Sequence, residues 1–209
     1  MIGIWNYTVI LTYTSLASAV CGMIMAMNGR IMTALLCLAF SGLCDAFDGR
    51  IARSKKNRTN AEVLFGIELD SLCDVVAFGF LPTVICYQMG VHSWPGIVLI
   101  IFYCIAAVAR LAYYNMLELD TERKAEEGTE YYYGLPVTSI AVIFPVLYFV
   151  SYWITIEFKP LVWELMLLIV GGMFISNIRI AKPKLVHILI LTLIVAALFI
   201  AMPFIPMTV

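Results

Sequence analysis

Four aspartates lie in two apolar stretches of the sequence, at spacings that would let them act together. The first stretch contains SGLCDAFDGRIAR, in which Asp45 and Asp48 are three residues apart. The second contains FGIELDSLCDVVAFG, in which Asp70 and Asp74 are four residues apart. Residues three or four apart share one face of a helix. We therefore expect each stretch to present two carboxylates on a single helix face.

Carboxylates at this density require a cation. A single charge at the centre of a bilayer costs about 2.5–3.5 kcal/mol on insertion scales, and such residues are usually functional. Oxygen ligands suit Mg²⁺ or Mn²⁺, and two divalent ions would balance four carboxylates. The pattern predicts an oxygen-rich cage for two divalent cations between two helices.

The elements that position these residues are predicted to be membrane-spanning helices. The chain of 209 residues is 63% apolar and only 13% charged, whereas soluble domains carry about a quarter charged residues. We expect an all-α, polytopic transmembrane bundle forming one membrane domain over 1–209. The core would be 31–89, with 95–145 completing the pocket. Seven stretches are long enough to span, or eight if Pro145 divides the fifth: 6–27, 31–53, 61–89, 95–117, 134–156, 160–178 and 185–207.

The distribution of basic residues predicts the orientation. One set of loops is rich in Lys and Arg, whereas the opposite set holds only Arg30 and Lys159. Basic loops face the cytoplasm, so we expect a multi-pass protein of the cell membrane whose carboxylates open toward the cytoplasm. The residues of the basic set are Arg53, Lys55, Lys56, Arg58, Arg123, Lys124, Arg179, Lys182 and Lys184.

Two glycines accompany the carboxylates. Gly49 follows Asp48, and Gly66 lies one turn before Asp70. Glycine inside a helix costs about 1 kcal/mol relative to alanine. It is useful where a ligand comes close, or where two membrane helices pack tightly. Both interpretations remain open at this point.

Together these residues read Asp45-x2-Asp48-Gly49-x2-Ala52-Arg53, followed by Gly66-x3-Asp70-x3-Asp74. This pattern resembles the signature of the CDP-alcohol phosphotransferases. The spacer between Arg53 and Gly66 holds twelve residues, more than is common in that family. The difference puts loop contacts by Lys55, Lys56 and Arg58 in doubt.

Three further stretches resemble the phosphatidylserine synthase branch of the family. They are GIELDSLCDVVAFGFLP, the segment RLAYYN at 110–115 and the segment GLPV at 134–137. The resemblance covers roughly residues 10–145, and the last two predicted spans are only generically similar.

The resemblance implies a reaction and a role for each motif residue. Asp45, Asp48, Asp70 and Asp74 would hold two Mg²⁺ or Mn²⁺ ions against the pyrophosphate of CDP-diacylglycerol. Asp74 would also be the general base for the hydroxyl of L-serine, and phosphatidylserine and CMP would be the products. Gly49, Ala52 and Gly66 would make room for the nucleotide. Arg53 would pair with phosphate, or would simply extend to the membrane surface. The resemblance also implies a homodimer among membrane lipids.

The acceptor needs a cation for its carboxylate. Arg110 is the only arginine well inside the fourth predicted span, so it is our candidate, with Asn115 as a hydrogen-bonding neighbour. The alternative is that Arg110 pairs with a carboxylate of the cage.

Two other functions compete with this interpretation. The same reaction could use another acceptor, such as glycerol phosphate or an inositol compound. Phosphate acceptors need several cations, and the single arginine within the helices favours serine. A cation transporter also lines its path with carboxylates, but the sequence shows neither related halves nor interrupted helices. We expect no nucleic-acid partner.

Overall fold

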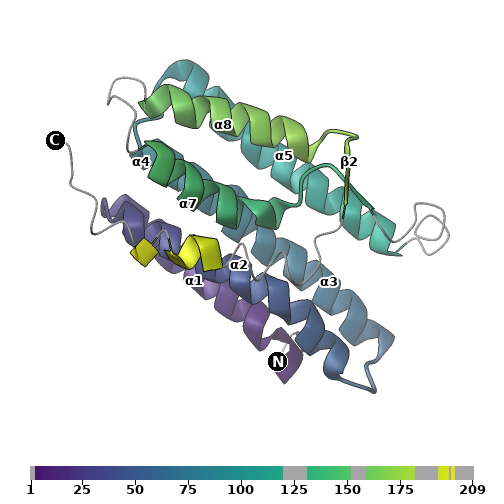
Figure 1. Ribbon diagram of the computed structural model, residues 1–209. Coiled ribbons are helices and arrows are strands. Elements are labelled where there is room, and N and C mark those ends of the chain that lie inside the picture. Colours follow the sequence, from purple (N-terminus) through teal and green to yellow (C-terminus); the bar gives the residue numbers. More distant parts are fainter. Residues whose placement is uncertain (1–2, 120–130, 152–158, 182–192, 198, 201–209) are drawn as a thin grey trace.

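The computed structural model describes residues 3–119, 131–151, 159–181, 193–197 and 199–200. These residues form helices and one pair of short strands (Figure 1). The elements in chain order are η1 (Tyr7–Val9), α1 (Ile10–Met27), α2 (Ile31–Ser54), α3 (Asn60–Asp74), η2 (Val75–Phe80), α4 (Leu81–Gln88), α5 (Trp94–Leu119), β1 (Tyr131–Tyr133), η3 (Val137–Ser139), α7 (Ile140–Ser151), α8 (Lys159–Phe174) and β2 (Arg179–Ala181).

Among the residues that the structure describes, four helical stretches have the length and hydropathy needed to cross a membrane. They are Tyr7–Met27, Ile31–Ser54, Asn60–Gln88 and Trp94–Leu117. Their bounds agree with the first four predicted spans to within a residue or so. The all-α membrane architecture is therefore confirmed for this half of the chain.

The predicted spans 134–156 and 160–178 differ from the helices observed. Helix α7 begins only at Ile140, and α8 ends at Phe174. Residues after α8 are extended instead, because the Gly134 amide donates to Ile178 O (2.8 Å) and the Leu135 amide to Met173 O (3.0 Å). Strand β2 then pairs antiparallel with β1.

The number of spans stays a prediction. Pro145 lies inside α7, and the helix continues through it to Ser151. The break that would create an eighth helix is therefore not found between Ile140 and Ser151. Most of the predicted span 185–207 lies outside the described residues.

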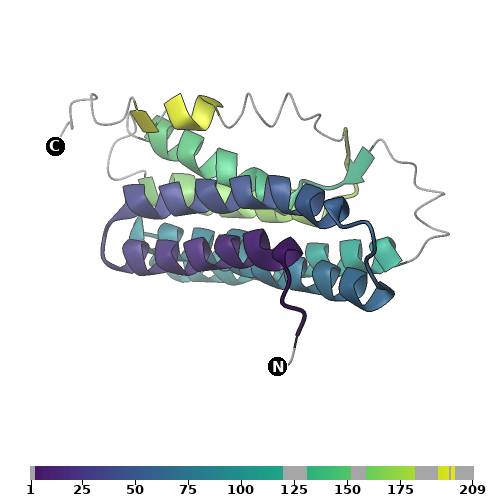
Figure 2. The same cartoon turned by 90° about the horizontal axis from the view of Figure 1, so that it is seen from below.

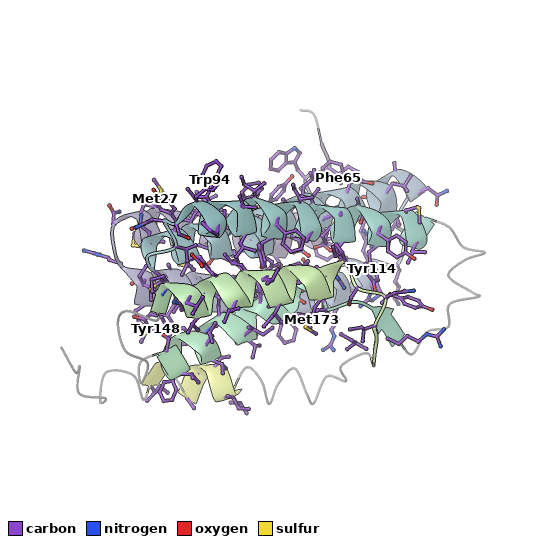
Figure 3. All side chains as sticks on the ribbon, turned by 90° about the horizontal axis from the view of Figure 1, so that it is seen from above. Met27, Phe65, Trp94, Tyr114, Tyr148 and Met173 are labelled. Carbon is purple, nitrogen blue, oxygen red and sulfur yellow. The ribbon has the colours of Figure 1, made fainter. Side chains whose placement is uncertain are left out.

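The long helices lie side by side along a common direction (Figures 1 and 2). Helix α1 packs chiefly against α2, and α5 against α8, while α7 joins the bundle through α2. Large side chains such as Met27 and Trp94 extend from the outer surface (Figure 3), where they are 67% and 77% exposed. Outward apolar side chains are expected where lipid is the solvent.

Small residues allow the closest helix contacts. Ser15 Oγ donates to Ser41 O (3.3 Å), and Ser41 Oγ donates back to Ser15 O (3.0 Å), which ties α1 to α2. A Cβ added to Gly42 would lie only 2.4 Å from Cβ of Ala141 in α7. Small residues at crossings are typical of membrane helices, and here they hold α2 between its two neighbours.

The third predicted span is one continuous helix with a π-helical turn. Helix α3 ends at Asp74, η2 is π-helical, and α4 continues the same direction. Pro82 has no N–H to donate to Phe78 O, four residues earlier. Tyr103 Oη of α5 donates to this carbonyl instead, at 2.8 Å, and Tyr103 is fully buried. Turns of this kind often lie at functional sites, and this one directly follows Asp74.

Replacing Tyr103 with phenylalanine should therefore destabilise the bundle. The substitution leaves Phe78 O buried without its hydroxyl donor, which costs about 1–3 kcal/mol. Thermal unfolding of the detergent-solubilised protein should show a lower midpoint for Y103F. Tyr87→Phe is the matched control, because Tyr87 is 47% exposed. Equal midpoints for the two variants would contradict the assigned role of the hydroxyl.

Candidate active site

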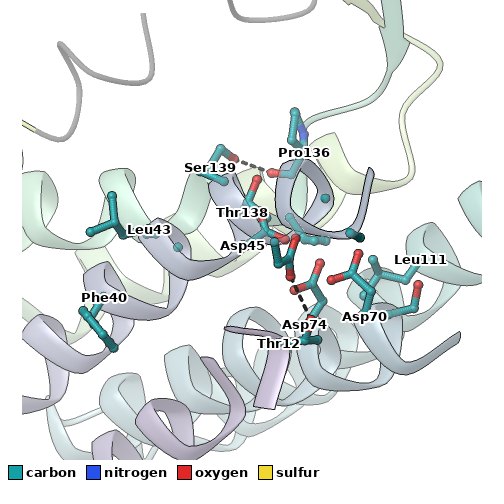
Figure 4. A pocket seen from close by; sticks show the side chains of 18 of the residues that line it. Thr12, Phe40, Leu43, Asp45, Asp70, Asp74, Leu111, Pro136, Thr138 and Ser139 are labelled. Atoms are coloured by element: carbon teal, nitrogen blue, oxygen red, sulfur yellow. Dashed lines mark hydrogen bonds between the residues drawn. The ribbon is translucent and has the colours of Figure 1, made fainter. Parts of the chain in front are cut away.

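Three of the four predicted aspartates converge between α2 and α3. Asp45, Asp70 and Asp74 each offer one carboxylate oxygen, and these oxygens lie within 4.8 Å of one another. Figure 4 shows their side chains pointing toward a common centre. The helical spacing predicted from the sequence therefore brings the two pairs face to face.

The fourth aspartate lies beside this cluster and has a partner from another helix. Asp48 is 7% exposed and lines the same cavity. Its Oδ2 accepts a hydrogen bond from Thr12 Oγ1 of α1 at 3.2 Å. Helix α1, which carries no residue of the motif, thus orients one of the motif carboxylates.

Helix α3 is held in place from the side of α5. Ser71 Oγ donates to Asn115 Oδ1 (2.6 Å), and Asn115 Nδ2 donates to Glu68 Oε2 (3.4 Å). Ser71 and Glu68 lie on either side of Asp70 in the sequence. After Asp74, Tyr103 of α5 donates to Phe78 O in the π-helical turn. Helix α5 therefore holds this helix both beside Asp70 and beyond Asp74.

The cluster fits a divalent cation. Charged carboxylates at this separation repel one another strongly in an apolar surrounding. Asp70 Oδ1 is buried and has no hydrogen-bond partner among the residues that the structure describes. Buried polar atoms without a partner are rare, and hard oxygen donors are what Mg²⁺ and Mn²⁺ prefer. The residues present thus fit the predicted metal, although its identity follows from neither geometry nor charge.

A cavity of about 940 Å³ surrounds the carboxylates. Its polar part holds the four aspartates and three arginines. Its other part is apolar and extends away from Asp45 past Leu43 toward Phe40 (Figure 4). The residues of this apolar part are Leu36, Ala39, Phe40, Leu43, Val142, Val195, Ala196 and Phe199. One cavity therefore offers both a charged and a lipid-like surface.

The residues predicted to hold the nucleotide all line the cavity. These are Gly49, Ala52, Arg53 and Gly66. A Cβ added to Gly49 would lie 3.6 Å from the guanidinium of Arg53, whereas one added to Gly66 would lie 2.9 Å from Nη2 of Arg58. Each glycine thus lies against an arginine side chain rather than against another helix, so the tight-packing interpretation does not account for them.

The two residues predicted to bind serine also line the cavity, and both have protein contacts. Arg110 is 7% exposed, and its guanidinium lies 4.4 Å from the ring centre of Tyr114. Asn115 uses its oxygen and its nitrogen for the contacts to α3 described above. Asn115 therefore positions α3 in the structure, and its contact with serine stays a prediction.

The sequence interpretation missed several residues of the cavity. Thr8 and Thr12 come from the N-terminal helices, Ser71 and Tyr114 lie next to residues that were singled out, and Pro136–Ser139 form the turn before α7. Hydroxyl residues within apolar helices were the available signal, because their polar groups need partners in a membrane. That signal does not say which helix faces the carboxylates.

Several known proteins are similar to this chain in sequence. The chain is 32% identical over 133 residues to the CDP-diacylglycerol–serine O-phosphatidyltransferase of Mycobacterium tuberculosis, covering 63% of this chain and 45% of that protein. It is 31% identical over 160 residues to the protein of that name from Saccharomyces cerevisiae, covering 68% of this chain and 56% of that protein. The Bacillus subtilis protein of that name is 26% identical over 160 residues, covering 76% of this chain and 77% of that protein.

The chain spans about half the length of the first two relatives. The model of the CDP-alcohol phosphatidyltransferase family matches residues 5–207, which include every residue of the carboxylate cluster and every residue that lines the cavity. The chain therefore belongs to the CDP-alcohol phosphatidyltransferase family.

Proposed function

We propose that this protein transfers the phosphatidyl group of CDP-diacylglycerol to the hydroxyl of L-serine, giving phosphatidylserine and CMP. The observation that carries the proposal is the convergence of Asp45, Asp70 and Asp74 in a cavity that is charged at one end and apolar at the other. A reaction between a nucleotide-linked lipid and a polar alcohol needs both surfaces at one place. The names of the relatives supply the donor and the acceptor.

The four aspartates would hold two divalent cations, Mg²⁺ or Mn²⁺. When bound, these ions neutralise negative charge on the phosphoryl oxygens and on the departing CMP. Asp45, Asp70 and Asp74 supply the converging oxygens, and Thr12 sets the orientation of Asp48.

Asp74 would take the proton of the attacking alcohol. The serine oxygen attacks the phosphorus that bears diacylglycerol, the bond from this phosphorus to the CMP oxygen breaks, and the hydroxyl proton passes to the Asp74 carboxylate. A carboxylate is a weak base for an alcohol, so proton transfer accompanies bond formation in the transition state. Asp74 is 7% exposed, which limits competition from water.

The apolar part of the cavity would take the acyl chains. Leu36, Phe40 and Leu43 project from successive turns of α2 on the side away from the charged groups. Burial of each methylene of an acyl chain on such a surface contributes about 0.8 kcal/mol. The lipid would thus be anchored by its tails while its pyrophosphate reaches the carboxylates.

Another acceptor is the second candidate, and one observation favours it. The sequence pointed to serine because only Arg110 was evident inside the helices. The cavity is lined by Arg53 and Arg58 as well, so a phosphate-bearing acceptor would also find cations. The choice of serine over glycerol phosphate or an inositol compound therefore depends on the relatives rather than on the number of cations.

The setting of the enzyme remains as predicted from the sequence. We infer a multi-pass protein of the cell membrane, with its cavity open to the cytoplasm and a homodimer as the assembled form. A transporter is disfavoured because all four carboxylates come from two consecutive helices and line one cavity.

Purified protein should form labelled lipid from CDP-diacylglycerol and radiolabelled serine when a divalent cation is present. Glycerol 3-phosphate and inositol serve as parallel acceptors, and CMP release measures donor cleavage independently. Lipid label from serine alone would match the proposal. Labelled product from glycerol 3-phosphate or inositol, with none from serine, would replace serine as the acceptor.

Asp74→Asn should lower kcat by at least about a hundredfold, the usual size of a lost general base. The amide keeps the size of the side chain but accepts no proton. Glu164→Gln makes the same change on α8, where Glu164 contacts Ser93 and lies outside the cavity lining. Folding is compared by gel filtration and thermal unfolding. Wild-type turnover in a folded D74N protein would exclude Asp74 as the base.

Thr12→Val should raise the metal concentration needed for half-maximal activity by about tenfold, as is typical when an orienting hydrogen bond to a ligand is removed. Valine has the shape of threonine without the hydroxyl that holds Asp48. Thr12→Ser retains the hydroxyl and should restore the wild-type metal titration. If both variants lose activity equally and the metal titration does not move, Thr12 has only a packing role.

A further inference from the structure

The connection between α2 and α3 is the part of the motif whose length departs from the family pattern. It runs from Lys55 to Thr59, and its basic residues were the ones placed in doubt by the sequence. The structure separates them. Arg58 lines the cavity, whereas Lys56 is exposed and Lys55 forms an ion pair with Glu62.

Glu62 holds this connection in one conformation. Its side chain accepts from the Thr59 amide at 3.0 Å, and its own amide donates to Thr59 Oγ1 at 3.2 Å. This capping box starts α3. Lys55 contacts the same carboxylate, and Asn6 Nδ2 donates to it from the N-terminal segment at 3.1 Å. The loop is therefore fixed to both α3 and the segment before α1.

The fixed loop directs Arg58 along the first turns of α3. Nη2 of Arg58 donates to Glu62 O at 3.2 Å. The same nitrogen would lie 2.9 Å from a Cβ at Gly66, so the glycine leaves room for the guanidinium in this position. Gly66 is one turn before Asp70, and Arg58 lines the same cavity as the carboxylates.

The guanidinium of Arg58 has donors to spare. A guanidinium carries several N–H groups in a planar fork that matches phosphate oxygens. Nε of Arg58 is buried without a hydrogen-bond partner in the described part of the chain. A buried donor of this kind is costly, unless a ligand completes it.

We propose that Arg58 binds the phosphate oxygens of the nucleotide-linked lipid, as a second cation beside Arg53. The inference rests on the proposed function, because the donor substrate is taken from it. Arg53 lies against Gly49 on α2, and Arg58 lies against Gly66 on α3. The two guanidinium groups therefore line the polar part of the cavity from two different helices. The longer connection between α2 and α3 would then contribute directly to binding of the donor lipid.

Binding of CDP and of CMP to the detergent-solubilised full chain tests this role directly. With divalent cation present, Arg58→Ala should weaken CDP binding by about tenfold, as expected for the loss of a charge-assisted hydrogen bond. CMP, which lacks one phosphate, should lose less. Arg58→Lys keeps the charge without the planar fork and should lie between Arg58→Ala and wild type. Lys56→Ala removes a neighbouring exposed charge and should match wild type.

Turnover separates a donor role from an acceptor role. Arg58→Ala should raise KM for CDP-diacylglycerol by about tenfold with little change in kcat or in KM for serine, because binding of one substrate alone is lost. A rise confined to KM for serine would place Arg58 at the acceptor and overturn the inference. Unchanged CDP affinity in a folded Arg58→Ala protein would also overturn it.

The same measurements distinguish this inference from the proposed function. If Arg58→Ala binds CDP about tenfold more weakly than wild type, but neither protein uses serine, the role of Arg58 stands and the serine assignment fails. If wild type makes phosphatidylserine and Arg58→Ala binds CDP normally, only the role of Arg58 fails. A wild-type protein that binds no CDP contradicts both.

Discussion

The mutual repulsion of carboxylates in an apolar bundle is the constraint on which the rest of the structure depends. Oxygens of Asp45, Asp70 and Asp74 lie within 4.8 Å of one another, a distance at which two unit charges interact by about 4 kcal/mol near a protein surface. A bundle can relieve such repulsion by separating its helices or by binding cations. Helix α1 packs against both α2 and α3, so moving these two helices apart would cost those contacts. Bound cations would balance the charge without that cost.

Neighbouring helices hold the carboxylates together through polar contacts as well as apolar ones. Thr12 of α1 donates a hydrogen bond to Asp48, and Asn115 of α5 accepts one from Ser71. Tyr103 of α5 donates to the carbonyl of Phe78, four residues after Asp74. Each contact comes from an element outside the four-aspartate motif. In lipid a polar group has few alternative partners, so these bonds select one arrangement of the helices.

Periodicity and charge were sufficient to predict the carboxylate pairs, their shared faces and the first four spans. These properties depend on local spacing, which the sequence displays directly. The partner of Asp48, the π-helical turn after Asp74 and the entry of Arg58 into the cavity depend on which helices meet. The early end of α8 at Phe174 has the same origin, because its following residues pair with Gly134 and β1 instead of continuing a helix.

Some of the residues that line the cavity belong to the family motif, and others lie outside it. The aspartates, the glycines and Arg53 all lie within residues 45–74 on α2 and α3, which under the proposed function would bind the donor. Other parts of the cavity wall come from Arg110 and Tyr114 of α5 and from Pro136–Ser139, residues outside that motif. Tyr114 Oη donates to Tyr133 O at 2.7 Å, which ties α5 to the segment that leads into Pro136–Ser139. Under the proposed function, an acceptor that contacts these residues could change in identity while α2 and α3, which would hold the cations, stay the same.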